Sequence, residues 1–242
     1  MNILLTGASS GIGYATALEL VKSADNKVYA ISRNKEKLEK LRQEYQQMNF
    51  SGKLEVLSGD LTSDVDRARM KSAILSSTNT LDILINNAGL LINKPFQNLS
   101  EGDWQAIYST NVFSVAAIIR DMLPLLCESN LKSHGYRAHI VNIGSIGGLN
   151  GSSKFPGLSA YSSSKAALAV MTECLAEEFK ELKVAVNSLA LGSVHTEMFS
   201  KAFPGMTAAR TAEEMAEYIA DFAMKGNRYF NGKNLPVSGS TP

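Results

Sequence analysis

Short apolar runs rich in β-branched residues alternate along the chain with longer segments in which apolar residues recur at helical spacing. The short runs predict strands at residues 2–6, 27–32, 54–58, 81–86, 139–143, 184–189 and 234–237. The longer segments predict helices at residues 14–23, 35–48, 64–76, 103–127, 159–181 and 212–225. Strands separated by helices pair in parallel through right-handed crossovers. The pattern therefore predicts a single α/β domain over residues 1–242, with a doubly wound, Rossmann-type, mostly parallel sheet.

The composition is that of a globular protein and narrows the classes of partner. Hydrophobic residues make up 45% and charged residues 19% of the chain, which excludes disorder, collagen-like repeats and coiled coil. A formal net charge of +1 provides no general field for nucleic acid or an anionic membrane, so we expect neither as a partner. The first apolar run, residues 3–5, is too short for a signal peptide, and we expect no membrane-spanning stretch and a cytoplasmic location.

The cysteines and histidines show no spacing typical of a metal site or a disulfide framework. Cys127 and Cys174 both lie in apolar, helix-like contexts, where a free cysteine usually acts as a small buried hydrophobe. His134 and His139 have no neighbouring ligand cluster and are interpreted as ordinary polar residues. We therefore predict that the protein binds no metal.

A glycine-rich turn of sequence TGASSGIG, residues 6–13, follows the first predicted strand and opens the first helix. Glycines permit a tight turn and let the backbone approach a pyrophosphate, whose charge then meets free N–H groups and the positive helix end. Such turns also occur without a ligand, but the place after the first strand of a βαβ unit favours dinucleotide binding. The predicted cofactor contacts of the turn are Gly7, Ser9, Ser10, Gly11, Ile12 and Gly13.

The end of the second predicted strand indicates which dinucleotide is bound. NAD-binding folds usually place an acidic residue here to hold the ribose 2′-hydroxyl, whereas an arginine suits a 2′-phosphate. This chain has Arg33 at that point, with Lys35 and Lys37 adding local positive charge. A single arginine is by default a solvated surface residue. Its position nevertheless favours NADP(H) as the preferred cofactor, with NAD(H) as the alternative.

Tyr161 and Lys165 lie four residues apart at the start of a predicted helix, so they share one helix face. An ammonium at ~4 Å and an effective dielectric of ~20 favours the phenolate by ~4 kcal/mol, which lowers a tyrosine pKa by about three before desolvation opposes it. That change brings a phenol into the range of general acid–base catalysis. Ser145, just past the fifth predicted strand, is placed to hydrogen-bond the substrate oxygen.

Together these motifs resemble the short-chain dehydrogenase/reductase family over nearly the whole chain. Residues 6–13 match its cofactor turn, and residues 86–89 match its N-N-A-G segment. The resemblance identifies the catalytic set as Ser145, Tyr161, Lys165 and Asn111. It implies that Lys165 also binds the nicotinamide ribose, and that Asn111 anchors a water linking Lys165 to bulk solvent.

The resemblance implies further cofactor contacts at the ends of later strands. Asp60 and Leu61 would border the adenine, and residues 87–89 would support the cofactor; the predicted contacts are Asn87, Ala88, Gly89, Tyr161 and Lys165. After the sixth strand, Gly192, Val194 and Thr196 fit the family pattern at the start of a substrate loop at about residues 193–211. Leu191 stands where the family commonly has proline, which predicts a less preset loop.

Together, the motifs and the resemblance predict an oxidoreductase that passes hydride between NADP(H) and a carbonyl or alcohol substrate of ketone, aldehyde or 3-oxoacyl type. Apolar residues in the surrounding loops indicate a partly apolar substrate, or serve only packing: Leu90, Leu91, Leu149, Phe155, Met198, Phe199, Phe203 and Met206. Two alternatives remain open, a dinucleotide-sensing binding protein and an epimerase or dehydratase that acts through transient oxidation. The Ala-rich helix around residue 166 and the resemblance predict a homodimer or homotetramer.

Overall fold

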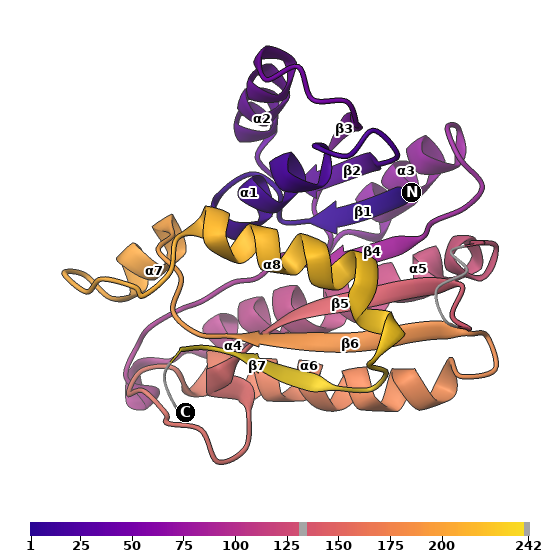
Figure 1. Ribbon diagram of the computed structural model, residues 1–242. Coiled ribbons are helices and arrows are strands. Elements are labelled where there is room, and N and C mark those ends of the chain that lie inside the picture. The colour runs from indigo at the N-terminus through magenta and orange to yellow at the C-terminus, as the bar shows by residue number, and fades with distance from the viewer. Residues whose placement is uncertain (131–134, 240–242) are drawn as a thin grey trace.

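One sheet of parallel strands organises the part of the chain that the computed structural model describes, residues 1–130 and 135–239 (Figure 1). Its seven strands follow the order β3-β2-β1-β4-β5-β6-β7. The strands are β1 Asn2–Thr6, β2 Lys27–Ser32, β3 Lys53–Ser58, β4 Ile83–Asn86, β5 Ala138–Ser145, β6 Val184–Leu191 and β7 Asn234–Val237. The strand order reverses between β1 and β4, which is the topological switch point of a doubly wound fold. The predicted fold class is therefore confirmed.

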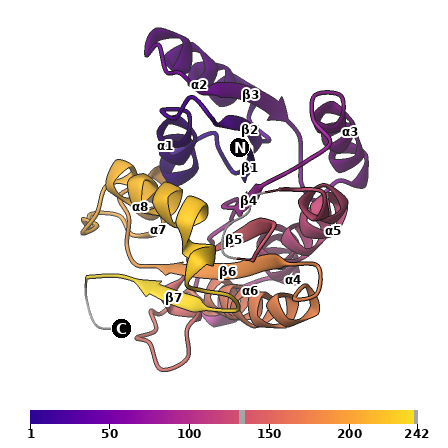
Figure 2. The same ribbon diagram turned by 45° about the vertical axis from the view of Figure 1, so that its right-hand side comes forward.

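Helices cover both faces of the sheet, with α1, α2 and α8 on one side and α3, α5 and α6 on the other (Figure 2). The α-helices are α1 Gly11–Leu20, α2 Lys35–Gln47, α3 Asp64–Leu75, α4 Glu101–Tyr108, α5 Ser114–Cys127, α6 Ser159–Glu178, α7 Glu197–Ala202 and α8 Ala212–Lys225. Single 3-10 turns occur at Phe96–Asn98, Ile146–Gly148 and Gly226–Arg228, and Ser109–Phe113 forms a π-helical segment.

The alternation of side chains along each strand divides the interior into two cores. In β1, Ile3 and Leu5 pack with α1 and α8, whereas Leu4 between them packs with α3 and α5 on the opposite face. All three side chains are fully buried. Because a parallel sheet of this kind is covered on both faces, its strands read as nearly continuous apolar runs, which is the pattern that predicted them.

Polar side chains cap the N-termini of several helices. Ser100 and Thr211 each form a capping box at the beginning of α4 and α8, and Asn34 caps α2 by accepting from the Lys37 N–H at 2.8 Å. Ser10, the residue before α1, makes no such side-chain cap. The first N–H groups of α1 are thus left for another partner.

Several predicted boundaries differ from the structure, and those nearest the pocket are the most informative. β5 runs to Ser145, beyond the predicted end at 143, because it pairs with a longer β6 up to Leu191, so Ser145 ends the strand instead of following it. The predicted helix 103–127 begins at Glu101 and contains the π-helical segment. α7 forms within the predicted substrate loop, where Thr196 caps it by accepting from the Phe199 N–H at 3.1 Å.

The continuous helix Glu101–Cys127 is by length and composition apolar enough to cross a membrane, which corrects the expectation that no stretch reaches this length. Half of the relevant window is buried inside the protein. Ile118, Ile119 and Met122 pack into the core beside α3 and the sheet. Packing against the sheet therefore accounts for the apolar character of this helix.

His134 lies outside the described residues. Cys127 and Cys174 are free thiols; Cys127 is partly buried, but Cys174 is exposed, so the expectation of a buried cysteine is wrong for Cys174. Across residues 1–130 and 135–239, no three His, Cys, Asp or Glu side chains are grouped so that they can share a metal ion.

Candidate active site

The glycine turn between β1 and α1 forms a cradle that only glycine can build. Gly7 and Gly11 have positive φ values of 71° and 54°, which L side chains rarely adopt. A Cβ at Gly13 would lie 2.2 Å from the Gly7 carbonyl oxygen, so the turn and the helix approach too closely for any side chain. Asn87, after β4, fixes the turn by donating from Nδ2 to the carbonyls of Thr6 (3.0 Å) and Gly7 (3.2 Å).

These features fit a dinucleotide pyrophosphate. The uncapped start of α1 presents backbone N–H groups and the positive end of the helix dipole toward the cradle. The absence of Cβ atoms leaves room for phosphate oxygens close to the backbone. The chain therefore has a built site for the phosphates of such a cofactor.

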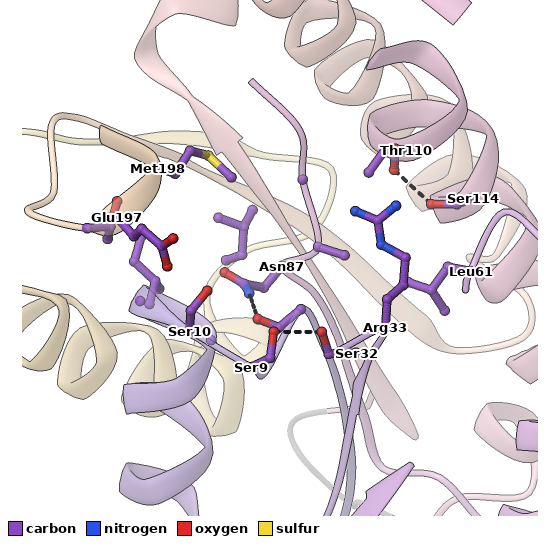
Figure 3. Close-up of a pocket in the computed structure, with 18 of the residues that line it drawn as sticks. Ser9, Ser10, Ser32, Arg33, Leu61, Asn87, Thr110, Ser114, Glu197 and Met198 are labelled. Atoms are coloured by element: carbon purple, nitrogen blue, oxygen red, sulfur yellow. Dashed lines mark hydrogen bonds between the residues drawn. The ribbon is translucent and has the colours of Figure 1, made fainter. Parts of the chain in front are cut away.

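A pocket of about 300 Å³ extends from this turn along the carboxyl ends of the strands (Figure 3). Most of the predicted cofactor residues line it, namely residues 7 and 9–13, Arg33, Asp60, Leu61, residues 87–89, Tyr161, Lys165 and Thr196. Gly192 and Val194 are not part of the lining, although Leu191 and Thr196 on either side of them are. Ser145 and Asn111 are each the next residue after one that lines the pocket, Gly144 and Thr110. The topology thus gathers segments that are more than a hundred residues apart in the sequence.

Other residues of the lining were not predicted as cofactor contacts. Ser32, Thr62, Thr110, Ser114 and Glu197 contribute polar groups to the pocket. Ser32 donates from Oγ to the Ser9 Oγ at 2.7 Å and so joins the end of β2 to the glycine turn. The signal that could have found Ser32 and Thr62 is their position at strand ends, whereas Thr110 and Glu197 reach the pocket only through the packing of helices.

Arg33 leaves the end of β2 and extends beside the pocket (Figure 3). Its side chain is 67% exposed, and its Nη1 lies 3.9 Å from Oδ2 of Asp60. An ion pair at this distance and exposure binds the guanidinium weakly. Arg33 therefore remains available to an anionic group of a ligand.

Tyr161 and Lys165 open α6 and project toward the same pocket. The Lys165 Nζ lies 5.9 Å from the centroid of the Tyr161 ring and donates to the Ile143 carbonyl at 2.8 Å. Lys165 is almost fully buried, and this burial lowers the pKa of its ammonium to about 8.

The expected lowering of the Tyr161 pKa by Lys165 is wrong for the protein without a ligand. Burial raises the pKa of Tyr161, and a hydrogen bond with Ser145 opposes this only in part. Desolvation of the phenol is the largest cause, and the Lys165 ammonium donates its hydrogen bond to the Ile143 carbonyl while lying 5.9 Å from the centre of the Tyr161 ring. Tyr161 is therefore a protonated phenol at neutral pH, which is the form that donates a proton.

Ser145 is held beside α6 by the turn Ile146–Gly148. Its Oγ accepts a hydrogen bond from the Gly147 N–H at 3.2 Å. A Cβ at Gly148 would lie 2.7 Å from the carbonyl carbon of Lys165, so the turn packs directly on the first turns of the helix. This close approach brings Ser145 and Tyr161 within hydrogen-bonding reach of each other.

Asn111 lies in the π-helical segment and is fully buried. Its Oδ1 accepts from the Leu90 N–H at 2.8 Å, and its Nδ2 donates to the Leu90 carbonyl and to the Ser164 Oγ, both at 2.9 Å. A Cβ at Gly89 would lie 3.6 Å from both Asn111 Oδ1 and Lys165 Nζ. Asn111 thus fixes the segment after β4 next to Lys165, and its role in a water relay remains a prediction.

The loop after β6 is held in place without the proline that the family commonly has. Leu191 continues β6 and pairs with Ser145 on one side and Val237 on the other. The Gly192 N–H donates to the Val237 carbonyl at 3.0 Å. β7 therefore restrains the start of the loop, and the expectation of a less preset loop stays a prediction.

Aromatic and apolar side chains gather over the loops that border the pocket. Phe203 of the predicted substrate loop contacts Phe155 edge to face and Phe199 at a tilted angle, with ring centroids 6.2 and 5.2 Å apart. Leu90, Leu91 and Met198 line a second cavity that adjoins the first. The role of these residues in a partly apolar substrate site stays a prediction.

Comparison with known proteins gives consistent matches. The sequence profile of a family described as short chain dehydrogenase matches residues 1–207. Dehydrogenase/reductase SDR family member 11 of Gallus gallus is 33% identical over 190 residues, covering 78% of this chain and 71% of the relative. The NADP-dependent 3-hydroxy acid dehydrogenase of Schizosaccharomyces pombe is 32% identical over 208 residues, covering 84% of this chain and 75% of the relative.

A solved structure matches over almost the whole chain. The RhlG/NADP active-site complex of Pseudomonas aeruginosa superposes with a TM-score of 0.86 at 27% sequence identity. The match covers 99% of this chain and 95% of that chain. The arrangement of strands and helices described above is therefore shared with a protein whose structure was solved with NADP.

Proposed function

Since the chain belongs to the short-chain dehydrogenase/reductase family and is an NAD(P)-dependent oxidoreductase, we propose that it prefers NADP(H) and interconverts a small-molecule carbonyl compound and its alcohol. The observation that carries the proposal is one pocket that joins the glycine turn and Arg33 at one end to Tyr161 and Lys165 at the other. The length of a dinucleotide spans such a pocket, with phosphates at the turn and the reacting ring near Tyr161.

The proposed reaction uses Tyr161 as the proton donor. A bound reduced nicotinamide supplies hydride to the carbonyl carbon. Tyr161, protonated because burial raises its pKa, gives its proton to the carbonyl oxygen, while Ser145 hydrogen-bonds the same oxygen and orients it. The phenolate that forms is stabilised by the Lys165 ammonium, which is mostly charged at pH 7 because its pKa is about 8. In the reverse direction Tyr161 accepts the proton of the alcohol.

The preference for NADP(H) rests on Arg33. Its exposed guanidinium is free to pair with an adenosine 2′-phosphate, while Asp60 and Leu61 border the adenine. Two similar proteins point the same way, because one is named as NADP-dependent and the other was solved as an NADP complex. NAD(H) remains the weaker cofactor in this proposal.

Replacing Arg33 tests this choice of cofactor. A charge-assisted hydrogen bond contributes about 1.5–3 kcal/mol, so Arg33→Asp is expected to lower NADPH affinity roughly ten- to hundredfold and to spare NADH. Arg42→Asp is the matched control, because Arg42 is an exposed arginine of α2 that pairs with Glu39 of the same helix. Fluorescence titration of both cofactors measures the effect. Equal use of NADH and NADPH by the native protein would contradict the assignment.

The substrate is proposed to be a ketone, an aldehyde or a 3-oxoacyl compound with an apolar portion. The aromatic cluster of Phe155, Phe199 and Phe203 supports this, and the named activity of the Schizosaccharomyces pombe relative concerns a 3-hydroxy acid. A screen of carbonyl compounds and alcohols with both cofactors tests the proposal. Steady net consumption of NADPH supports it, whereas tightly retained cofactor without net turnover would favour epimerisation or dehydration.

Assembly and location complete the proposal. We expect a homodimer or homotetramer in the cytoplasm, with helix α6 at a contact because small residues such as Ala166, Ala167 and Ala169 permit close approach of helices. Light scattering tests the assembly, because a monomer has a mass of 26.1 kDa.

A further inference from the structure

The substrate loop leaves the sheet after β6, and its two ends are hydrogen-bonded to each other. Val194 pairs with Arg210 as an isolated bridge, and the His195 N–H donates to the Arg210 carbonyl at 2.8 Å. Helix α7 lies within this excursion, close to the start of α8 and next to α1 (Figure 1). These backbone contacts fix the two ends of the loop. The position of α7 between them depends on contacts that its own side chains make.

One side of α7 rests directly on the phosphate cradle. Thr196, the capping residue of α7, would contact a Cβ at Gly11 through Cγ2 at 3.0 Å. Glu197 and Met198 follow it and line the pocket (Figure 3). The first turn of α7 therefore forms part of the wall that a bound dinucleotide must pass when it enters or leaves.

Glu197 also reaches across to α2. Its Oε2 accepts from the Lys37 Nζ at 2.7 Å, and its Oε1 accepts from the Lys201 Nζ, also at 2.7 Å. Lys201 belongs to α7 itself, whereas Lys37 lies 160 positions away in α2, which follows β2 and Arg33. The carboxylate thus makes one bond within its own helix and one to α2, and Lys37 and Glu197 both line the second cavity, which adjoins the dinucleotide pocket.

The Glu197 carboxylate is ionised over the working pH range. Lys201 and then Lys37 lower the pKa of Glu197 to about 2, so the carboxylate stays ionised. Roughly half of the Glu197 side chain and 40% of that of Lys37 are exposed, so the pair is partly solvated and responds to salt. Such a bond can open and close at modest cost.

We propose that Glu197 is a positioning residue, and that its bond with Lys37 latches α7 over the bound dinucleotide and slows cofactor release. The inference rests on the proposed function, because the latch needs a dinucleotide in the pocket between Arg33 and Tyr161. A ligand that runs from the end of β2 past the glycine turn passes Glu197, whose carboxylate joins α7 to α2 through Lys37. Opening the bond frees the first turn of α7, and closing it confines the ligand.

Two other roles for the same residues predict different results. If Lys37 instead binds the 2′-phosphate directly, its loss affects NADPH but not NADH. If Glu197 acts only by repelling the cofactor phosphates, its neutralisation tightens binding of both cofactors. The latch predicts that loss of either Glu197 or Lys37 speeds the release of both NADPH and NADH, because the ion pair between these residues does not involve the 2′-phosphate.

The test is stopped-flow measurement of NADPH and NADH dissociation from the full-length protein. Glu197→Gln and Lys37→Gln are each expected to accelerate the release of both cofactors about two- to fivefold, the range of a partly exposed ion pair. Lys201→Gln is the matched control, since it removes the other ammonium from the same carboxylate and leaves the bond between α7 and α2 in place. Its dissociation rates are expected to stay within experimental error of the native values.

A charge swap separates the latch from a general loss of structure. In the Lys201→Gln background, Lys37→Glu places two carboxylates together and is expected to give the fastest release. Adding Glu197→Lys restores an opposite pair and is expected to return the rate toward native. In the native protein the release rate rises with salt and meets that of Glu197→Gln near 1 M, where the screening length is about 3 Å.

Four results of these measurements would contradict the proposed latch between Glu197 and Lys37. Slower release in Glu197→Gln, an effect of Lys37→Gln on NADPH alone, or an equal acceleration in Lys201→Gln each contradicts the latch. Failure of the charge swap to restore the rate contradicts it as well. A native protein that binds neither cofactor overturns the proposed function itself, and this result is distinct from normal binding with unchanged release rates.

Discussion

Both ends of the parallel sheet bury titratable side chains, but they do so in different ways. Toward the amino end, His139 of β5 and Asn187 of β6 are fully buried among backbone groups. At the carboxyl end, Lys165 is almost as deeply buried, yet it lines the pocket with Tyr161. The comparison shows that burial alone does not identify a reactive group.

The amino end is a closed network. The His139 Nδ1 donates to the Ala223 carbonyl at 2.9 Å, which leaves Nε2 to accept from the Asn187 Nδ2 at 3.0 Å. Asn187 also donates to the Phe230 carbonyl at 2.9 Å and accepts from the Lys233 N–H at 3.1 Å. Since every polar atom of both side chains has a partner, the network stabilises one arrangement of the strands and offers nothing to a ligand.

The carboxyl end is open by comparison. An ammonium has three N–H donors, and among the described residues Lys165 uses one of them, on the Ile143 carbonyl. The glycine cradle likewise presents backbone N–H groups at the uncapped end of α1. Groups that are desolvated but incompletely bonded have free energy to gain from a ligand. The two ends therefore differ in hydrogen-bond satisfaction, and this difference separates a binding site from a structural core.

Among the variants that test this comparison of the two ends of the sheet, Tyr161→Phe is expected to have the largest effect on turnover. Tyr161→Phe removes the proton donor and keeps the ring, so turnover is expected to fall at least a hundredfold, with general acid catalysis contributing up to about ten-thousandfold. NADPH affinity and the free energy of unfolding are expected to stay near native. Turnover is measured with the carbonyl found in the screen, and affinity by fluorescence titration. Near-native turnover would move the proton donor to Ser145 or to a water.

Lys165→Met tests whether the buried ammonium at the carboxyl end of the sheet supports turnover while it lowers the free energy of unfolding. Turnover is expected to fall about a hundredfold, and cofactor affinity to fall with it, because the ammonium that stabilises the phenolate and contacts the ribose is lost. Stability at pH 7 is expected to rise by about 1 kcal/mol, since a buried charge with few partners is replaced by an apolar chain of similar length. Denaturant unfolding measures this change. A marked loss of stability would show that Lys165 is as structural as His139.

A change at His139 is expected to have the smallest effect on turnover, because this residue affects the pH dependence of stability and not catalysis. Burial lowers its pKa from 6.5 to about 4, so the folded protein keeps it neutral where an unfolded chain takes up a proton. Stability is therefore complete above pH 6.5 and falls by up to about 3 kcal/mol as the pH drops toward 4.

The matched variant is His139→Gln, whose amide can donate to Ala223 and accept from Asn187 without titrating. Its unfolding free energy, measured by denaturant titration from pH 7 to 4, is expected to fall less steeply than that of the native protein. Catalytic constants at pH 7 are expected to be unchanged, because the network lies away from the pocket. Parallel slopes in the two proteins would place the acid sensitivity in other groups.

Predictions from sequence were accurate where short-range spacing carries the information. The glycine turn depends on residues that follow one another, and its cradle geometry follows from Gly7, Gly11 and Gly13 themselves. The pairing of Tyr161 and Lys165 on one helix face depends only on their four-residue spacing. The end of β5 was misplaced because its length is set by its partner β6, which comes about forty residues later.

The sequence by itself determined the alternation of strands and helices, the cofactor turn and the shared helix face of Tyr161 and Lys165, because each depends on the type and spacing of near neighbours. Ser145 and Asn111 are candidate catalytic residues by the resemblance to the family and not by spacing. Only the tertiary structure decided that burial raises the pKa of Tyr161, that β7 restrains the loop after Leu191, and that Glu197 of α7 meets Lys37 of α2. Desolvation and distances between remote segments arise only when the chain is packed, so no local pattern encodes them.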